Sequence, residues 1–369
     1  MPTATASPTL TTRELNRATL ARQLLLEREQ LPVLRAVERL VALQAQQAKP
    51  PFVGLWSRVE GFRRDDLTRL LQKRDVVRAT LMRGTLHLAS AKDYLKLRVA
   101  FSPLLEASVH SVLRERAKGL DIEPLVLAAR EYLEEEPRTF EEVRDHLLER
   151  YPKADERAMG FLVRMYLPLV QVPTDAEWGF PPATDFALAE SWLGEPLGNG
   201  AALDTLVLRY LSAFGPATVG DVQTWTGLKG LKDVLASLKP KLRTFRDEKG
   251  RELFDLPKAP RPPEDTPAPP RFLPEFDSLV LGHDDRARLV ADAHRPRLIT
   301  KNLRIPATFL VDGFVTGTWK VERKKTTAAL LVEPFEPLTK KTRDALTGEG
   351  EGLLRFVEPE ARAFEVRFA

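Results

Sequence analysis

The chain has 369 residues, of which 56 are Lys or Arg, 52 are Asp or Glu and none is Cys. The lack of Cys excludes disulfides and thiolate metal sites, and no stretch approaches the roughly 18 apolar residues that a membrane span needs. A hydrophobic fraction of 43% allows a sizeable core, the length predicts two or three domains, and the net charge of +4 neither requires nor excludes a nucleic-acid partner. Residues 1–12 carry no signal-peptide pattern, so we expect a disordered leader and a cytoplasmic protein.

A helical unit that ends in a β-hairpin is predicted for residues 13–118. Its helices are indicated by apolar residues at helical spacing, and its strands by short apolar runs. The predicted elements are helices over 13–26, 33–43 and 65–73 and strands over 76–81 and 85–88. Pro50 and Pro51 cannot continue the second helix, and Met82-Arg83-Gly84 joins the two strands.

A second unit with a similar order of elements is predicted for residues 119–198. Thr139 and Glu142 form a T-x-x-E capping box, which marks the start of a helix. The other predicted elements are helices over 121–134 and 155–166 and strands over 169–172 and 185–189.

The clearest unit covers residues 199–257. Its predicted elements are helices over 203–214, 219–225 and 231–238 and strands over 242–245 and 252–256. The strands flank a hairpin turn at residues 247–250. Helix, helix–turn–helix and β-wing in this order is the winged-helix pattern, and the two earlier units are looser versions of it. We therefore predict three tandem winged-helix units.

A Pro-dense segment, KAPRPPEDTPAPPR over residues 258–271, is expected to be a stiff, extended linker. It leads to a β-rich domain over residues 272–369. The elements predicted there are strands over 279–281, 307–311, 315–321, 328–332 and 364–368 and a short helix over 339–346. The fold class is thus α+β, with a C-terminal sheet or barrel.

The most informative segment is L-Q-A-Q-Q-A-K-P-P-F over residues 43–52. On a regular helix, Gln44 and Gln46 would lie about 200° apart and would not share a target. On a non-helical segment, the two carboxamides can face the same side. The alternative interpretation is a polar helix C-terminus, which the spacing alone does not exclude.

A second candidate is L-M-R-G-T-L-H-L over residues 81–88. Strand alternation predicts that Arg83, Thr85 and His87 lie on one face, which would present a cation, a hydroxyl and an imidazole together. The alternative is an ordinary hairpin in which His87 makes a local hydrogen bond.

Two further segments are rich in charge. Asp277, Asp284 and Asp285 suggest metal or acid–base chemistry, but they form no convincing ligand set, and a salt-bridged loop is the alternative. The run T-W-K-V-E-R-K-K over residues 318–325 can bind phosphates or can be a basic strand end. Because the five His are not at metal-ligand spacing and no P-loop or GxGxxG occurs, we expect neither a metal nor a cofactor.

Together these segments resemble the bacterial winged-helix DNA glycosylases typified by AlkZ and YcaQ. The resemblance spans nearly the whole chain from about residue 15. It is carried, in the same order, by L-Q-A-Q (43–46), M-R-G-T-L-H-L (82–88), L-P-E-F-D-S-L-V-L-G-H-D-D-R (273–286) and T-F-L-V-D-G-F-V-T-G-T-W (308–319). Gln44-Ala45-Gln46 matches the Gln-apolar-Gln signature of AlkZ-like members, whereas the YcaQ-like branch has Gln-apolar-Asp.

The resemblance implies three winged-helix motifs and a β-rich, barrel-like domain around a C-shaped channel of DNA size. It implies Gln44 and Gln46 as the catalytic residues of a monofunctional enzyme that removes N7-alkylated purines and unhooks interstrand cross-links of the azinomycin or nitrogen-mustard type. The expected DNA contacts are Arg83, Thr85, His87, Arg286, Lys320 and Arg323.

The expected partner is double-stranded DNA with alkylated or cross-linked purines, bound by a monomer that is independent of metals, nucleotide cofactors and membranes. One alternative is a winged-helix transcription regulator, which needs the same fold without catalysis and typically binds a palindromic site as a dimer. A second alternative is a protein-interaction scaffold, which would lack salt-dependent affinity for DNA.

Overall fold

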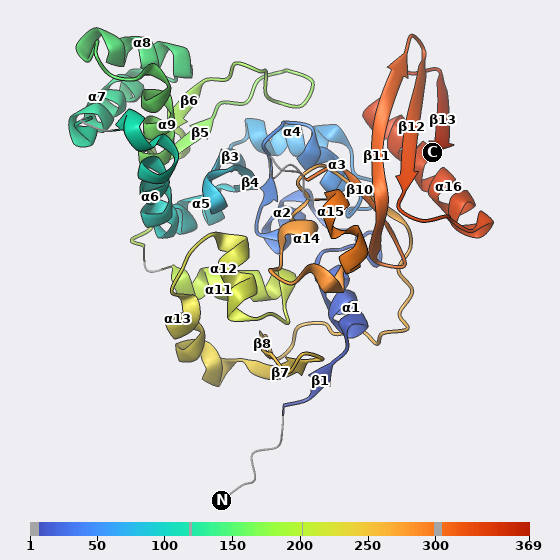
Figure 1. The fold of residues 1–369 in the computed structure, drawn as a ribbon. Coiled ribbons are helices and arrows are strands. Elements are labelled where there is room, and N and C mark those ends of the chain that lie inside the picture. Colours follow the sequence, from blue (N-terminus) through green and yellow to red (C-terminus); the bar gives the residue numbers. More distant parts are fainter. Residues whose placement is uncertain (1–6, 118–119, 201, 299–304) are drawn as a thin grey trace, which may run out of the picture.

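The computed structural model describes residues 7–117, 120–200, 202–298 and 305–369. In these ranges the chain has a mixed α+β fold, as predicted, with helices packed around sheets of three, five and five strands (Figure 1). The predicted unit boundary at 118/119 lies outside the described residues.

The central sheet combines strands from the first two predicted units in the order β2-β4-β3-β5-β6. Ala79 of β3 pairs with Val170 of β5, so the two predicted hairpins are joined in one sheet. The strands are β2 (Leu43–Gln44), β3 (Val76–Thr80), β4 (Leu86–Ser90), β5 (Leu169–Gln171) and β6 (Phe186–Leu188). The helices before and after its first hairpin are α1 (Thr12–Arg22), α2 (Val33–Leu40), α3 (Pro50–Trp56), α4 (Arg64–Gln72), α5 (Ala91–Leu97) and α6 (Ser102–Leu113).

The second helical group begins with the predicted capping box. Thr139 N–H donates to the Glu142 carboxylate at 2.8 Å and Glu142 N–H donates to Thr139 Oγ1 at 3.2 Å, which confirms this helix start. The helices of this group are α7 (Ile122–Glu135), α8 (Phe140–Arg150), α9 (Glu156–Tyr166) and α10 (Ala189–Leu193). They bury an apolar core shared with the central sheet and the third group.

The third group has the element order predicted from the sequence: three helices followed by a hairpin. These elements are α11 (Leu203–Phe214), α12 (Val219–Thr226), α13 (Leu231–Leu238), β7 (Arg243–Asp247) and β8 (Glu252–Asp255). Strand β1 (Thr9–Leu10) adds in parallel to β7, so residues 9–12 are ordered and the expectation of a leader over 1–12 fails for them. Residues 1–6 lie outside the described residues.

The C-terminal sheet is open, and the predicted barrel is wrong. Its order is β13-β12-β11-β10-β9, and the edge strands β13 and β9 do not pair with each other. In a closed barrel, the side chains of the sheet itself would fill the interior. Here α16 (Lys340–Val357) packs its apolar side chains against the sheet and covers its apolar face instead. The strands are β9 (Arg271–Leu273), β10 (Thr308–Val311), β11 (Phe314–Lys324), β12 (Thr327–Pro334) and β13 (Ala363–Phe368).

Two local predictions in this part need correction. The strand predicted over 279–281 is the short helix α14 (Ser278–Leu281), because the Asp277 carboxylate accepts the Leu279 N–H at 2.9 Å and caps a helical turn. Helix α16 starts as predicted after Thr339 but continues far past Leu346, through three glycines. At Gly350 a Cβ would lie 2.7 Å from the Leu330 side chain, so this glycine permits the close packing of α16 on the sheet.

The predicted linker is packed against α1. Arg17 Nε donates to the Thr266 carbonyl at 2.7 Å, and Arg22 Nη2 donates to the Pro260 carbonyl at 3.1 Å. Arg22 also forms a buried ion pair with Asp255 at 2.6 Å. Helix α1 therefore ties the third group, the linker and the C-terminal sheet together.

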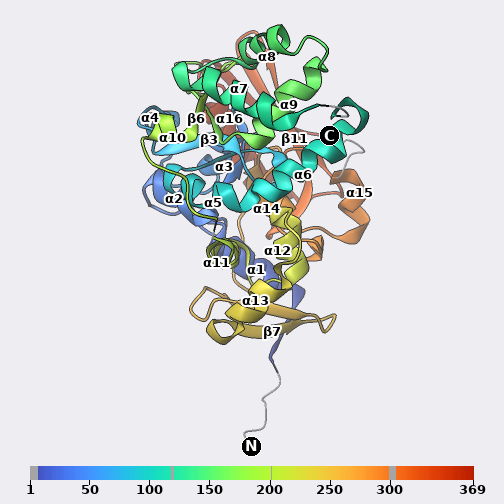
Figure 2. The same ribbon diagram turned by 90° about the vertical axis from the view of Figure 1, so that its left-hand side faces the viewer.

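In Figure 1 the β11–β12 hairpin and helices α7–α9 lie on opposite sides of the central sheet, and Figure 2 shows α11–α13 and β7 below both.

Within the described ranges, none of the helices combines the length and the apolar character that a membrane span requires.

Candidate active site

Gln44 and His87 lie opposite each other where β2 pairs with β4. Helix α2 ends at Leu40, short of the predicted residue 43, and Val41 adopts a φ of 68°. The Ala45 N–H donates to the Leu86 carbonyl at 2.7 Å and extends the strand pairing past Gln44. The glutamine motif is thus not a helix end: Gln44 ends a short edge strand and Gln46 follows in a bend. A non-helical segment is the condition under which both glutamines can face one target.

Both carboxamide oxygens are held by donors from residues 83–86. Gln44 Oε1 accepts a hydrogen bond from Arg83 Nη2 at 2.9 Å, and Gln46 Oε1 accepts one from the Leu86 N–H at 3.0 Å. A guanidinium and a backbone N–H can only donate, so the facing atoms must be the carboxamide oxygens and both amides have a defined orientation. Gln44 is only 7% exposed, whereas Gln46 is exposed.

Arg78 supports the backbone of the glutamine motif, and the sequence analysis missed it. Its Nε donates to the Ala45 carbonyl at 2.8 Å and its Nη2 donates to the Gln46 carbonyl at 3.2 Å. Burial lowers the pKa of Arg78 to about 10. An arginine inside the apolar run V-V-R-A-T was the available signal, because a cation in a buried strand needs acceptors.

Arg83 links the glutamine motif to the third helical group. Its backbone has a φ of 55°, and its Nη1 donates to the Trp225 carbonyl in α12. Burial, and then the nearby Arg286, lower the pKa of Arg83 to about 10, so it remains a cation at neutral pH. Within the described part of the chain, its recorded partners are a carbonyl and a carboxamide, and no carboxylate neutralises it.

Strand alternation predicted that His87 shares a face with Arg83 and Thr85. This prediction is wrong, because His87 is fully buried. The alternation fails because Arg83 lies in the 3₁₀ turn Met82–Gly84, before the strand begins. His87 Nδ1 lies 2.9 Å from the Thr85 carbonyl and donates to it, which leaves Nε2 unprotonated. Burial, and then Arg83, lower the pKa of His87 to about 3, so the ring is neutral and the side chain is not placed to contact DNA.

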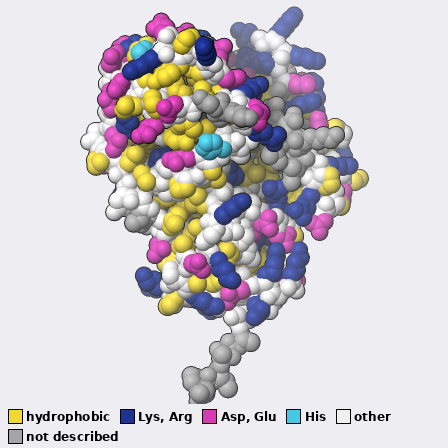
Figure 3. All heavy atoms as spheres, turned by 60° about the vertical axis from the view of Figure 1, so that its left-hand side comes forward, with side chains coloured by type: hydrophobic (Ala, Val, Ile, Leu, Met, Phe, Trp, Pro, Cys, Tyr) yellow, Lys and Arg dark blue, Asp and Glu magenta, His cyan; other side chains and the backbone are white. Residues whose placement is uncertain are grey.

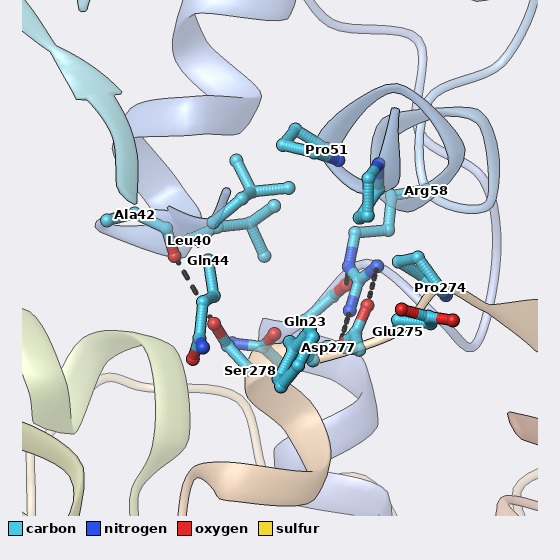
Figure 4. A pocket seen from close by; sticks show the side chains of 13 residues that line it. Gln23, Leu40, Ala42, Gln44, Pro51, Arg58, Pro274, Glu275, Asp277 and Ser278 are labelled. Atoms are coloured by element: carbon cyan, nitrogen blue, oxygen red, sulfur yellow. Dashed lines mark hydrogen bonds and ion pairs between the residues drawn. The ribbon is translucent and has the colours of Figure 1, made fainter. Parts of the chain in front are cut away.

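A small pocket lies directly beside Gln44 (Figure 4). The Gln44 side chain points toward Ser278, and the opposite wall carries the ion pair of Arg58 and Asp277. The Arg58 guanidinium donates to both Asp277 oxygens, at 2.8 and 2.9 Å, and both side chains are nearly inaccessible. This pair joins the segment after α3 to the start of α14 and thereby holds this wall of the pocket in place.

Of the other two acidic residues of this segment, Asp285 forms ion pairs and Asp284 accepts a hydrogen bond from a hydroxyl. Asp285 accepts from Lys249 at 2.6 Å and from Arg251 at 2.7 Å. Burial opposes ionisation of Asp285, but the Lys249 hydrogen bond and its neighbours lower its pKa to about 2. Asp284 lies 3.4 Å from the Thr224 hydroxyl. The salt-bridged loop is therefore the interpretation that fits these contacts.

Three predicted DNA contacts lie on the C-terminal part. Arg286 is partly buried near Arg83, with its pKa lowered by burial and then by Arg295. On the β11–β12 hairpin, Lys320 lies 3.6 Å from Glu333 and Arg323 lies 2.8 Å from Glu358. The recorded partners of the two hairpin residues are thus glutamates, whereas Arg286 lies near Arg83, which contacts Gln44.

Glu358 connects the hairpin to the segment that follows the glutamines, a link that no local sequence pattern indicated. It pairs with Arg323 and also lies 3.9 Å from Lys49 Nζ. Lys49 lies three residues after Gln46, over the Trp178 ring at 5.5 Å. Burial lowers the pKa of Lys49, while Glu358 opposes that shift.

This arrangement of fold and site places the chain among known proteins. The family model for the DNA glycosylase AlkZ-like proteins matches residues 37–356, and the chain belongs to this family.

A curated relative is the "Interstrand DNA cross-link repair glycosylase" of Streptomyces sahachiroi. It is 26% identical over an alignment of 345 residues that covers 85% of this chain and 88% of that protein. Among solved structures, the Streptomyces sahachiroi DNA glycosylase AlkZ superposes with a TM-score of 0.78 and 21% identity. That match covers 98% of this chain and 100% of the other, which shows that the two share a fold.

Proposed function

We propose that this protein is a monofunctional DNA glycosylase that hydrolyses the N-glycosidic bond of N7-alkylated purines in double-stranded DNA, including those in interstrand cross-links. The observation that carries the proposal is the pair of oriented carboxamides, Gln44 and Gln46, held by Arg83 and Leu86. Membership of the AlkZ-like family and a curated relative named as a cross-link repair glycosylase support it.

The chemistry suits a pair of neutral amides. A purine alkylated at N7 carries a positive charge, and it leaves as a neutral base when the C1′–N9 bond breaks and its electrons move to the purine. Water adds its oxygen to C1′ and releases a proton to solvent, which gives an abasic site. No acid has to protonate the leaving base, so the protein must only position water and tolerate positive charge at C1′.

Gln46 and Gln44 serve as the positioning groups. Each carboxamide oxygen accepts one hydrogen bond from the protein and keeps one further acceptor position. That position can hold the attacking water, while the exposed Gln46 lies nearer to solvent than Gln44. The mechanism assigns no role to a metal, and the neutral His87 does not act as a base.

The DNA-binding surface is proposed to lie outside the second helical group. Residues 119–198 contain 17 Asp and Glu but only seven Lys and Arg, so the remainder of the chain is strongly basic. In Figure 3 the Asp and Glu side chains gather on the upper left lobe, whereas Lys and Arg line the receding arm and the lower part. DNA phosphates would be repelled by the acidic lobe and attracted by the surfaces that carry Lys and Arg.

Within that surface, the proposed phosphate contacts are Thr85, Arg286, and Lys320 and Arg323 on the β11–β12 hairpin. Arg83 lies beside the glutamines at the edge of this surface. We also assign the helical groups to three tandem winged-helix units over 13–118, 119–198 and 199–257, arranged around a C-shaped channel. We also propose that the enzyme acts as a monomer.

The test is excision from duplex DNA with one N7-methylguanine and, separately, one N7-linked interstrand cross-link. Abasic sites are revealed by alkali and resolved on a denaturing gel, with Gln46→Ala as the control. Excision by the wild type and loss with the variant would support the proposal. Salt-dependent binding without excision of either lesion would instead favour a DNA-binding regulator.

A further inference from the structure

We infer that Arg83 is a positioning residue that acts through Gln44, and that this role, rather than a simple phosphate contact, accounts for its place in the site. The inference rests on the proposed function and names the group that sets the geometry of one catalytic amide.

The first observation is the pair of acceptors that Arg83 bridges. One Nη reaches Gln44 Oε1 at 2.9 Å, and the other reaches the Trp225 carbonyl in α12. The planar guanidinium fixes the angle between two such donors, so the carbonyl on one side determines where the carboxamide lies on the other. Lysine, with a single ammonium on a flexible chain, cannot reproduce this bridge.

The second observation is that the backbone around Arg83 is shaped for this bridge. Arg83 has a φ of 55° and Gly84 a φ of 69°, a left-handed pair that costs free energy for the arginine. Beside α12, a Cβ on Gly227 would lie 3.3 Å from both the Cα and Cγ of Arg83, so a larger residue there would crowd the arginine. The third helical group thus packs against the residue that holds Gln44.

The consequence for Gln44 is electrostatic as well as geometric. A cation facing Oε1 prevents the amide from flipping, because the reversed amide would point its NH₂ group at the guanidinium. Gln44 therefore keeps its oxygen toward Arg83 and its NH₂ group on the other end. Gln46 is oriented by the neutral Leu86 N–H instead. The two glutamines are thus held by donors of different charge.

The experiment is a double-mutant cycle on single-turnover excision of N7-methylguanine, with DNA affinity measured in parallel. The variants are Arg83→Met, Arg83→Lys, Gln44→Ala and the combination of Arg83→Met with Gln44→Ala. The matched control is Arg74→Met, because Arg74 also has a left-handed backbone (φ 64°) and also donates to a tryptophan carbonyl, that of Trp192, but lies away from the glutamines.

Arg83→Met and Arg83→Lys are each expected to lower the saturated excision rate by about tenfold or more, with little change in DNA affinity, while Arg74→Met leaves both unchanged. Adding Arg83→Met to Gln44→Ala should cause no further loss, since the arginine acts through the missing amide. Thermal denaturation shows whether each variant folds. If Arg83→Met does not fold, the excision rate of Arg83→Lys tests the inference.

Two results would overturn the inference while leaving the proposed function intact. One is an equal loss from Arg83→Met in the presence and absence of Gln44. The other is full activity of Arg83→Lys at saturating DNA, or weaker DNA binding as the sole effect, which would make Arg83 a phosphate contact. Absence of excision by the wild-type protein would remove the proposed function itself and this inference with it.

Discussion

Gln44 and Arg83 are joined by a hydrogen bond of 2.9 Å between Oε1 and Nη2, although the two residues belong to different motifs of the sequence. The bond exists because β2 pairs with β4 and brings the glutamine motif against the turn that carries Arg83. It defines which atom of the Gln44 amide faces the protein.

Removal of either proposed catalytic amide should reduce excision without loss of DNA binding. Gln44→Ala and Gln46→Ala are each expected to lower the single-turnover rate by about 10²-fold, the typical effect of removing one positioned polar group. Gln47→Ala is the control, because Gln47 is in the same run but donates to Glu275 at 3.3 Å. Unchanged rates in both test variants would contradict the assigned mechanism.

The buried ion pair beside the site should be important for stability. Asp277→Asn leaves the Arg58 guanidinium buried without its carboxylate, which typically costs about 3–5 kcal/mol of folding free energy. Chemical denaturation measures this loss. Asp66→Asn, at the exposed pair of Asp66 with Arg63 and Arg69, should change the midpoint little. A midpoint for Asp277→Asn equal to that of the wild type would show that the pair is dispensable.

Acid should destabilise the protein partly through His87. Its pKa is about 3 in the folded chain against 6.5 ordinarily, so the unfolded chain binds the extra proton between these values. The contribution of His87 to the free energy of unfolding is therefore fully present above pH 6.5 and is lost as the pH drops toward 3. The free energy of unfolding should fall between pH 7 and pH 4.5, and we expect this fall to be smaller in His87→Asn by on the order of 2 kcal/mol. Urea titrations at the two pH values provide the measurement.

The same low pKa predicts that His87 does not shape the pH profile of excision above pH 5. A wild-type rate that rises with a midpoint near 6.5, and loses this midpoint in His87→Asn, would contradict a neutral, structural histidine.

The β11–β12 hairpin should contribute non-specific affinity for DNA. Lys320→Ala and Arg323→Ala are each expected to weaken binding to any duplex and to reduce the slope of log affinity against log salt by about one. The saturated excision rate should change little, because the recorded partners of these two side chains are Glu333 and Glu358 and not Gln44 or Gln46. Arg355→Ala, in an ion pair within α16, serves as the control. An unchanged salt slope in both hairpin variants would place the DNA elsewhere.

Local sequence patterns predicted most elements because local physics controls them. The Thr139–Glu142 capping box, the helices of the third group and the strands β11 and β12 all follow from caps and apolar runs within a few positions. The predictions failed where distant packing decides. Residues 279–281 form a helical turn because Asp277 caps it, and α16 passes through Gly350 because that glycine fits against Leu330.

The glutamine pair could be chosen as the candidate site from the sequence alone, since two amides two residues apart in a motif are visible without coordinates. The orientation of these amides depends on the folded chain, because their donors are Arg83 and Leu86, which are remote in the sequence. It also decided that His87 is buried and neutral, since the burial of a strand residue depends on what packs over it. Chemistry type is encoded in residue identity, whereas hydrogen-bond direction and protonation depend on neighbours that only the folded chain supplies.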